Sequence, residues 1–182
     1  MDVVIREWAG KDRSFRLNFG AVLDLEQALG GEGIGHVFIR VASGKFRALD
    51  IYCVLKFALI GGGMAIMDAK RLADEHFDRK PYLENASLAG DILTALMAGV
   101  EPDPDADPEA RTGEVPPPYK FSEVSQICRE FHISPVELRE MRYSDFTNMM
   151  RGYVAAKGSD APSHISEDEF ADILNRYEPE VP

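Results

Sequence analysis

The chain has 182 residues, a length that suits one medium domain or two small ones, and a net charge of −11. Residues 1–100 are nearly neutral, whereas residues 101–118 and 119–182 are both strongly acidic. Because acidic segments repel phosphate, we expect no nucleic-acid binding by the C-terminal half. The most apolar stretch, residues 51–67, is interrupted by a lysine and three glycines, which argues against a membrane span. No basic segment precedes an apolar core at the N-terminus, so we also expect no signal peptide.

The first residues predict a β-hairpin. Apolar residues recur at every second position at Val3 and Ile5 and again at Phe15, Leu17 and Phe19, which is typical of strands buried on one face. The segment Gly10-Lys11-Asp12 lies between the two runs and suits a hairpin turn.

Apolar residues then recur at helical spacing and predict five helices before residue 100. The expected positions are Val22–Leu29, 35–41, 48–60, 69–77 and the stripe from Leu88 to Met97. The third helix is apolar around much of its circumference and is expected to be the central core helix. Gly30-Gly31 and Gly61-Gly62-Gly63 are expected to end the first and third helices, and Asp68 to cap the fourth.

Residues 101–118 alternate acidic side chains with prolines, a composition that predicts a flexible linker and a domain boundary. Residues 119–182 predict a small helical module in which Ser134, Pro135 and Glu137 form a capping box. A following helix is expected to be capped by Ser144, and a short last helix to cover 167–177. The predicted fold is therefore α+β and mostly α: an N-terminal β-hairpin and helical bundle (1–100), the acidic linker (101–118) and a helical C-terminal module (119–182).

We find no motif of an enzyme or of a metal site in this sequence. The glycine-rich segments 30–35 and 61–63 follow helices and lack the Gly-Lys-Ser/Thr of a phosphate loop, so we interpret them as turns. The four histidines are scattered, and none has the partners that a zinc site needs. We therefore expect no catalytic residues, no cofactor and no metal ion.

Two helical features of the C-terminal half could bind a partner. Residues 124–141 have the outline of a helix-turn-helix, but Glu137 and Glu140 flank Arg139 on its second helix, which favours a plain helical hairpin over DNA reading. A separate stripe at spacings of three, four and seven is our candidate partner-binding surface, because methionine and aromatic side chains adapt to many sequences. Its residues are Phe146, Met149, Met150 and Tyr153. The alternative is that this stripe is core of the C-terminal module.

Two segments of the sequence resemble known families. The strand Ser14–Leu17, the run Asn18–Glu26 with its Gly-Ala pair, and the segment Arg47–Leu55 resemble the gene-transfer-agent family of tail assembly proteins, a likeness that extends over the N-terminal half. In the C-terminal half, the segment Ile133–Phe146 resembles a second small family of phage tail assembly chaperones, with Ser144 in place of the usual threonine.

The resemblance implies a non-enzymatic tail assembly chaperone, either the long form of a short chaperone or a permanent fusion of two. Its implied partners are the tape measure protein and the tail tube protein, with self-association possible. The implied location is the cytoplasm of a bacterial host, with the protein absent from the mature particle. Two alternatives remain open: a structural minor tail component that is retained in the particle, and an acidic helical regulator or adaptor.

Overall fold

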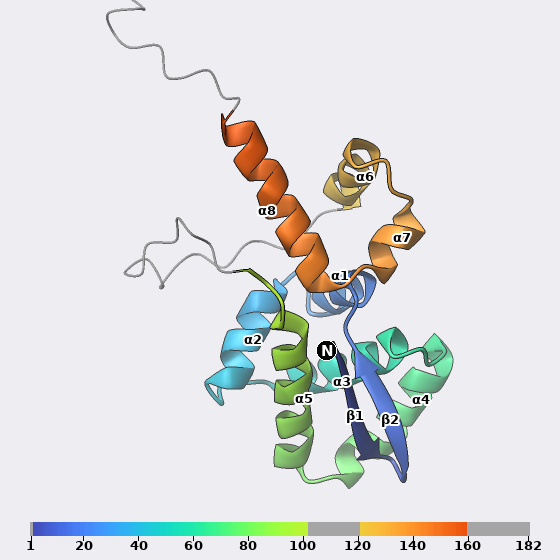
Figure 1. Ribbon diagram of the computed structural model, residues 1–182. Helices are drawn as coiled ribbons and strands as arrows, with labels where there is room; N and C mark the ends of the chain where they lie inside the picture. The colour runs from blue at the N-terminus through green and yellow to red at the C-terminus, as the bar shows by residue number, and fades with distance from the viewer. Residues whose placement is uncertain (1, 102–120, 160–182) are drawn as a thin grey trace, which may run out of the picture. The chain divides into compact units, whose positions relative to one another are not determined.

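The computed structural model describes residues 2–101 and 121–159 (Figure 1). Its elements are β1 (Val3–Trp8), β2 (Lys11–Arg16), α1 (Phe19–Ala28), α2 (Ile34–Ala42), α3 (Ala48–Gly61), α4 (Ile66–His76), the short 3-10 helix η1 (Phe77–Arg79), α5 (Tyr82–Met97), α6 (Phe121–Glu130), α7 (Pro135–Glu140) and α8 (Tyr143–Ser159). The predicted fold class, mostly helical with an N-terminal hairpin, is confirmed. The chain divides into two units, Met1–Asn148 and Met149–Pro182.

The hairpin turn begins one residue earlier than predicted and is shorter. β1 and β2 pair antiparallel, and the last pair joins Trp8 to Lys11. The two residues between them, Ala9 and Gly10, have φ angles of 54° and 75°. Two consecutive positive φ angles are typical of the tight type I′ turn, whose twist matches that of the strands. Lys11 and Asp12, which were expected in the turn, therefore belong to β2.

The buried face of the hairpin is also shifted by one residue in β1. Phe15 and Trp8 are buried, and their rings meet edge to face with centroids 6.3 Å apart. Val4 lies opposite Phe15 and packs against the core, whereas Ile5 is 67% exposed. The prediction that Ile5 faces the core is therefore wrong. Directly opposed residues of an antiparallel pair share a face, and Phe15 determines which face is buried.

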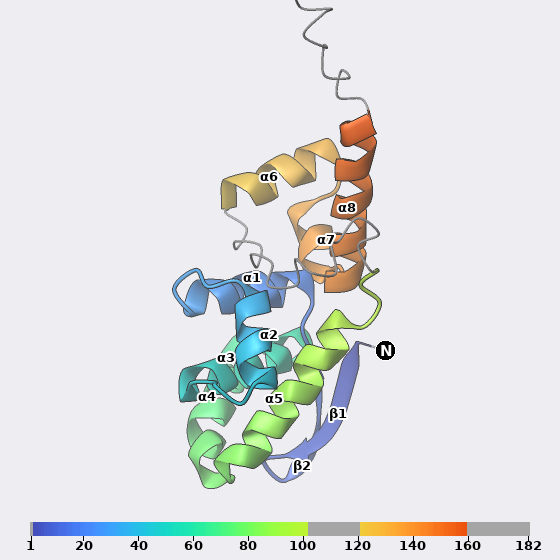
Figure 2. The ribbon, with the colours of Figure 1, turned by 90° about the vertical axis from the view of Figure 1, so that its left-hand side faces the viewer.

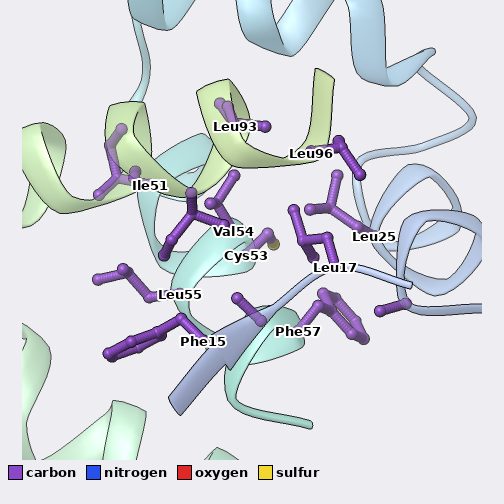
Figure 3. Packing of buried hydrophobic residues seen from close by; sticks show 14 of the residues in the cluster. Phe15, Leu17, Leu25, Ile51, Cys53, Val54, Leu55, Phe57, Leu93 and Leu96 are labelled. Carbon is purple, nitrogen blue, oxygen red and sulfur yellow. The ribbon is translucent and has the colours of Figure 1, made fainter. Parts of the chain in front are cut away.

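The central core position predicted for the third helix is confirmed. α3 packs against β2, α1, α4 and α5. Figure 3 shows its side chains between those of the hairpin and those of α5. The labelled residues are Phe15, Leu17, Leu25, Ile51, Cys53, Val54, Leu55, Phe57, Leu93 and Leu96. The apolar stripe predicted from Leu88 to Met97 lies within α5, as expected.

The glycine triplet ends α3, as predicted, and also lets the helix touch the hairpin. A Cβ on Gly61 would lie 2.2 Å from the carbonyl oxygen of Arg16, and a Cβ on Gly62 would lie 2.1 Å from that of Ser14. Both distances are far inside van der Waals contact, so only glycine fits at these two positions. The glycines are therefore structural, which agrees with their interpretation as a turn.

Two helix starts differ from the prediction. Phe19 does not extend the second strand but begins α1, because the Asn18 side chain accepts a hydrogen bond from the backbone of Ala21 and caps the helix. α4 begins at Ile66, so Asp68 is not its cap. Asp68 lies in the first turn of α4, where an acidic side chain suits the helix dipole.

In the C-terminal segment, the predicted capping box is confirmed: the Ser134 hydroxyl accepts from the Glu137 backbone (3.2 Å), and the Glu137 carboxylate accepts from the Ser134 backbone (2.8 Å). Ser144 is not a cap, because α8 begins at Tyr143 and Ser144 is buried in its first turn. Apart from Glu101, the predicted linker lies outside the described residues, as does the predicted helix 167–177. The three domain boundaries stay a prediction. No helix among the described residues is long and apolar enough to cross a membrane.

Candidate partner-binding surfaces

The structure separates the four residues that we predicted to bind a partner. Phe146 is completely buried, and its ring stacks on that of Phe19 with centroids 3.8 Å apart and an interplanar angle of 26°. Phe146 is therefore covered by Phe19 in the folded protein, and its role in partner binding stays a prediction. Met149, Met150 and Tyr153 are half-buried on α8. Their role in partner binding stays a prediction.

An apolar groove that the sequence did not predict lies between α2 and α5. The two helices run side by side in both views (Figures 1 and 2). The groove has a volume of about 390 Å³. Its α2 side is formed by half-buried side chains that include Phe38, Val41 and, just after the helix, Phe46.

The α5 side of the groove is shallow because its side chains are small. Ala86, Gly90 and Thr94 recur every four residues and so lie on one face of the helix. A Cβ on Gly90 would meet only a methyl group of Val41, at 3.9 Å. Leu83 stands at one end of the groove and is 75% exposed. A shallow apolar groove with a large exposed side chain at its end suits the apolar face of an amphipathic helix.

A buried ion-pair network holds α2 against α3. The Asp50 side chain has no solvent exposure, and it accepts two hydrogen bonds of 3.0 Å from the Arg40 guanidinium. It also accepts from the backbone and guanidinium of Arg47. Burial alone would raise the pKa of the Asp50 carboxyl, but the hydrogen bonds from Arg47 and Arg40 outweigh it and hold that pKa below its usual value. The Asp50 carboxylate is therefore charged at neutral pH and stabilises the α2 wall of the groove.

A second buried carboxyl holds the other end of α2. Glu26 of α1 is only 6% exposed, and one of its oxygens accepts a hydrogen bond of 2.7 Å from the backbone N–H of Ile34, the first residue of α2. Burial raises the pKa of the Glu26 carboxyl, and the single hydrogen bond from Ile34 only partly offsets this. Glu26 thus links the position of α1 to that of α2.

A second, more polar hollow of about 220 Å³ lies between β1 and α5. Its polar groups pair with one another: Arg6 with Asp91 at 3.1 Å, and the Trp8 indole with the Asn85 side chain at 3.0 Å. Asn85 in turn donates to the backbone oxygen of Phe77. These contacts account for the buried Asn85 side chain as part of the packing of the hairpin on α5.

The second helix of the expected helical hairpin faces α1. Within α7, Leu138 is buried, and the Arg139 guanidinium donates to the Asp24 carboxylate of α1 at 2.6 Å. The arginine that could have contacted DNA is thus engaged within the protein. This contact supports the interpretation of α6 and α7 as a plain helical hairpin.

The apolar groove and the half-buried methionines of α8 are typical of helical proteins that bind other proteins. A protein-family model described as "Phage tail tube protein, GTA-gp10" matches residues 4–99, more than half of the chain. The chain therefore belongs to this phage and gene transfer agent tail protein family, which confirms the resemblance of the N-terminal half. No curated protein and no solved structure gave a significant match. The resemblance of Ile133–Phe146 to a second family stays a prediction.

Proposed function

We propose that this protein is a non-enzymatic tail assembly chaperone that binds the tape measure protein and helps to recruit tail tube subunits. The observation that carries the proposal is the family match over residues 4–99. The apolar groove between α2 and α5 supports it, because a long amphipathic helix such as a tape measure protein would need a groove of this kind on its chaperone. The proposed location is the host cytoplasm, with the protein leaving before the particle matures.

A binding role is also supported by the chemistry of the interior. Three buried polar side chains each connect parts of the fold, since Asp50 joins two arginines, Glu26 accepts from the start of α2, and Asn85 holds the Trp8 indole. In catalytic sites, by contrast, titratable groups usually converge on a shared cavity. The three side chains in this protein instead link neighbouring elements of secondary structure.

A structural tail component is the second candidate, and the description of the family favours it because that description names the tail tube. Purified particles separate the two candidates. Mass spectrometry should find the protein absent from mature particles if it is a chaperone, and present in a fixed ratio to the tail tube subunit if it is a structural component.

The direct test of chaperone activity is co-expression with the tape measure protein of the same particle, with the soluble fraction of that protein as the measurement. Leu83→Glu places a charge at the end of the groove and should reduce the soluble fraction. Ile66→Glu is the matched control, because Ile66 is 67% exposed on α4 and does not line the groove. If the unsubstituted protein has no effect on solubility, the chaperone proposal is wrong. If Leu83→Glu and Ile66→Glu behave alike, the groove is not the binding surface.

A further inference from the structure

A small second core lies where the C-terminal segment meets α1. The main apolar cluster is built from the hairpin and helices α1 to α5. Several completely or nearly completely buried side chains do not belong to it: Phe19, Ile127, Leu138 and Phe146. Of these, only Phe19 comes from the first 100 residues, and the Phe146 ring is stacked on it. The burial of Phe19 therefore depends on a segment that lies more than 100 residues further along the chain.

Specific polar contacts fix how this segment lies on α1. The backbone N–H of Phe19 donates to the carbonyl oxygen of Met141 (2.9 Å), and the Asn18 amide donates to the Glu140 carboxylate (3.2 Å). Asn18 also forms an isolated antiparallel bridge with Arg142. These contacts pair groups of α1 with groups of the segment one by one, as at an interface between a domain and a bound peptide.

The far end of the segment also contacts the domain. The Asn148 amide donates to the carbonyl oxygen of Gly99 (2.9 Å), and its oxygen accepts from the backbone N–H of Glu101 (3.0 Å). Asn148 therefore satisfies backbone groups that follow the end of α5. Residues 138–148, which we term the clasp, are thus held at both ends.

Gly20 shows that α1 is shaped for this contact. Gly20 is the second residue of α1, although glycine is a poor helix former. A Cβ at this position would lie 2.8 Å from the Cβ of Arg139 and 3.0 Å from its carbonyl oxygen. The missing side chain lets the clasp approach the helix, and the Asp24 carboxylate one turn further along receives the Arg139 guanidinium. Asn18, Phe19, Gly20 and Asp24 together form what we term the α1 face.

The family match places the two sides of this contact in different parts of the chain. The α1 face lies within residues 4–99, which the family model matches, and the clasp lies outside them. We propose that the α1 face is a protein-docking site of the family domain, which this chain fills with its own clasp as a tethered ligand. The ligand that this site recognises carries an arginine for Asp24 and, seven residues later, an aromatic ring for Phe19. Tethering raises the effective concentration of the clasp to about the millimolar range, so even a weak contact stays closed in the intact chain.

The test uses the full chain with a protease site placed within residues 102–118. The protein is folded, cleaved and mixed with cleaved protein that carries a C-terminal tag, and exchange of the tag is followed by affinity capture. We expect the two pieces to stay together and to exchange between molecules. Gly20→Ala should weaken their association at least tenfold, while the far-UV circular dichroism of the cleaved protein is kept. Gly152→Ala is the control, because Gly152 lies in α8 with open space around it, and it should leave the association unchanged.

Several results would overturn the proposal. Loss of cooperative unfolding after cleavage, or the absence of any exchange, would show that the clasp is an inseparable part of the core. Separation of the unsubstituted pieces at micromolar concentration would show that the site does not hold its ligand. If Gly20→Ala itself unfolds the protein, exchanging the charges of Asp24 and Arg139 tests the proposal instead. Asp24→Arg should weaken the association, and Arg139→Asp in the same chain should restore it. Equal association in all charge variants would contradict the proposal.

Discussion

Replacing either of two glycines at the end of α3 should separate that helix from the hairpin. In Gly61→Ala, the new methyl group would lie 2.2 Å from the Arg16 carbonyl oxygen, and contact becomes ordinary only from 3.4 Å. The helix end or β2 must therefore move by about 1 Å. The obstacle is backbone, so no side chain can rotate away, and β2 carries the buried Phe15. Gly62→Ala meets the Ser14 carbonyl oxygen in the same way, at 2.1 Å.

The expected loss of stability follows from two opposing terms. Overpacking typically costs about 1–3 kcal/mol, and more where backbone must shift. Alanine in place of glycine in a helix interior returns up to about 1 kcal/mol, which is an upper limit for Gly61, the last residue of α3. Because backbone must shift, we take the upper end of the overpacking cost and expect a net loss of about 2 kcal/mol for Gly61→Ala, which lowers Tm by roughly 4–8 °C in a chain of this size.

Urea unfolding measured by circular dichroism tests this expectation. The urea concentration at the midpoint should fall, while the slope of the unfolding free energy against urea concentration stays the same, because unfolding exposes a similar area of surface. Gly152→Ala is the matched control, since a Cβ there meets no atom within 4 Å, and its midpoint should be unchanged or slightly higher. An unchanged midpoint for both Gly61→Ala and Gly62→Ala would refute the close approach of α3 to β2.

Three further predictions concern the charged and apolar residues described above. Asp50→Asn should cost about 2 kcal/mol at pH 7 in urea unfolding, because Arg40 loses its buried partner. The pKa of Asp50 is lowered in the folded state, so this difference should be present above pH 3.8 and disappear as the pH falls through the folded-state value. For Glu26→Gln, the dependence of stability on pH has the opposite sign. The pKa of Glu26 is raised in the folded state, so the stability of the variant relative to the parent should increase as the pH rises above 4.5. A difference in stability between Glu26→Gln and the parent that stays constant across this pH range would contradict this expectation. Met150→Glu should abolish solubilisation of the tape measure protein with the circular dichroism kept, whereas Arg151→Glu should leave it nearly intact. Unfolding by Met150→Glu would show that this part of α8 is core.

The sequence predicted the helices well because their apolar spacing and glycine ends are local signals. The prediction failed where the sequence pattern does not show which residues of a strand face the core. Val3, Val4 and Ile5 are three consecutive apolar residues, so alternation alone cannot tell which of them faces the core. The answer comes from Phe15, which lies opposite Val4 in β2. A shift of one residue reverses every side chain of a strand.

The candidate site was harder to predict for a different reason. Helical spacing identifies the apolar side of α8, but it does not reveal whether another helix covers that side. Phe146 is covered by Phe19, and this contact joins residues that are far apart in sequence. The α2–α5 groove was missed because its α5 side consists of small residues such as Ala86 and Gly90, which produce little hydrophobic signal. Small side chains become informative only once the facing helix is known.

α1 connects the two surfaces that we propose for partner binding, the groove and the α1 face. At its start, Phe19 and Gly20 contact the clasp. Near its end, Glu26 accepts from the first backbone N–H of α2, the helix that forms one wall of the groove. Because packed helices move as rigid bodies, a displacement of α1 on release of the clasp would be transmitted to Ile34 through this hydrogen bond. Binding at the groove should therefore differ between the closed and the released clasp, and Glu26→Gln, which keeps an acceptor, should preserve that difference, whereas Glu26→Ala should reduce it.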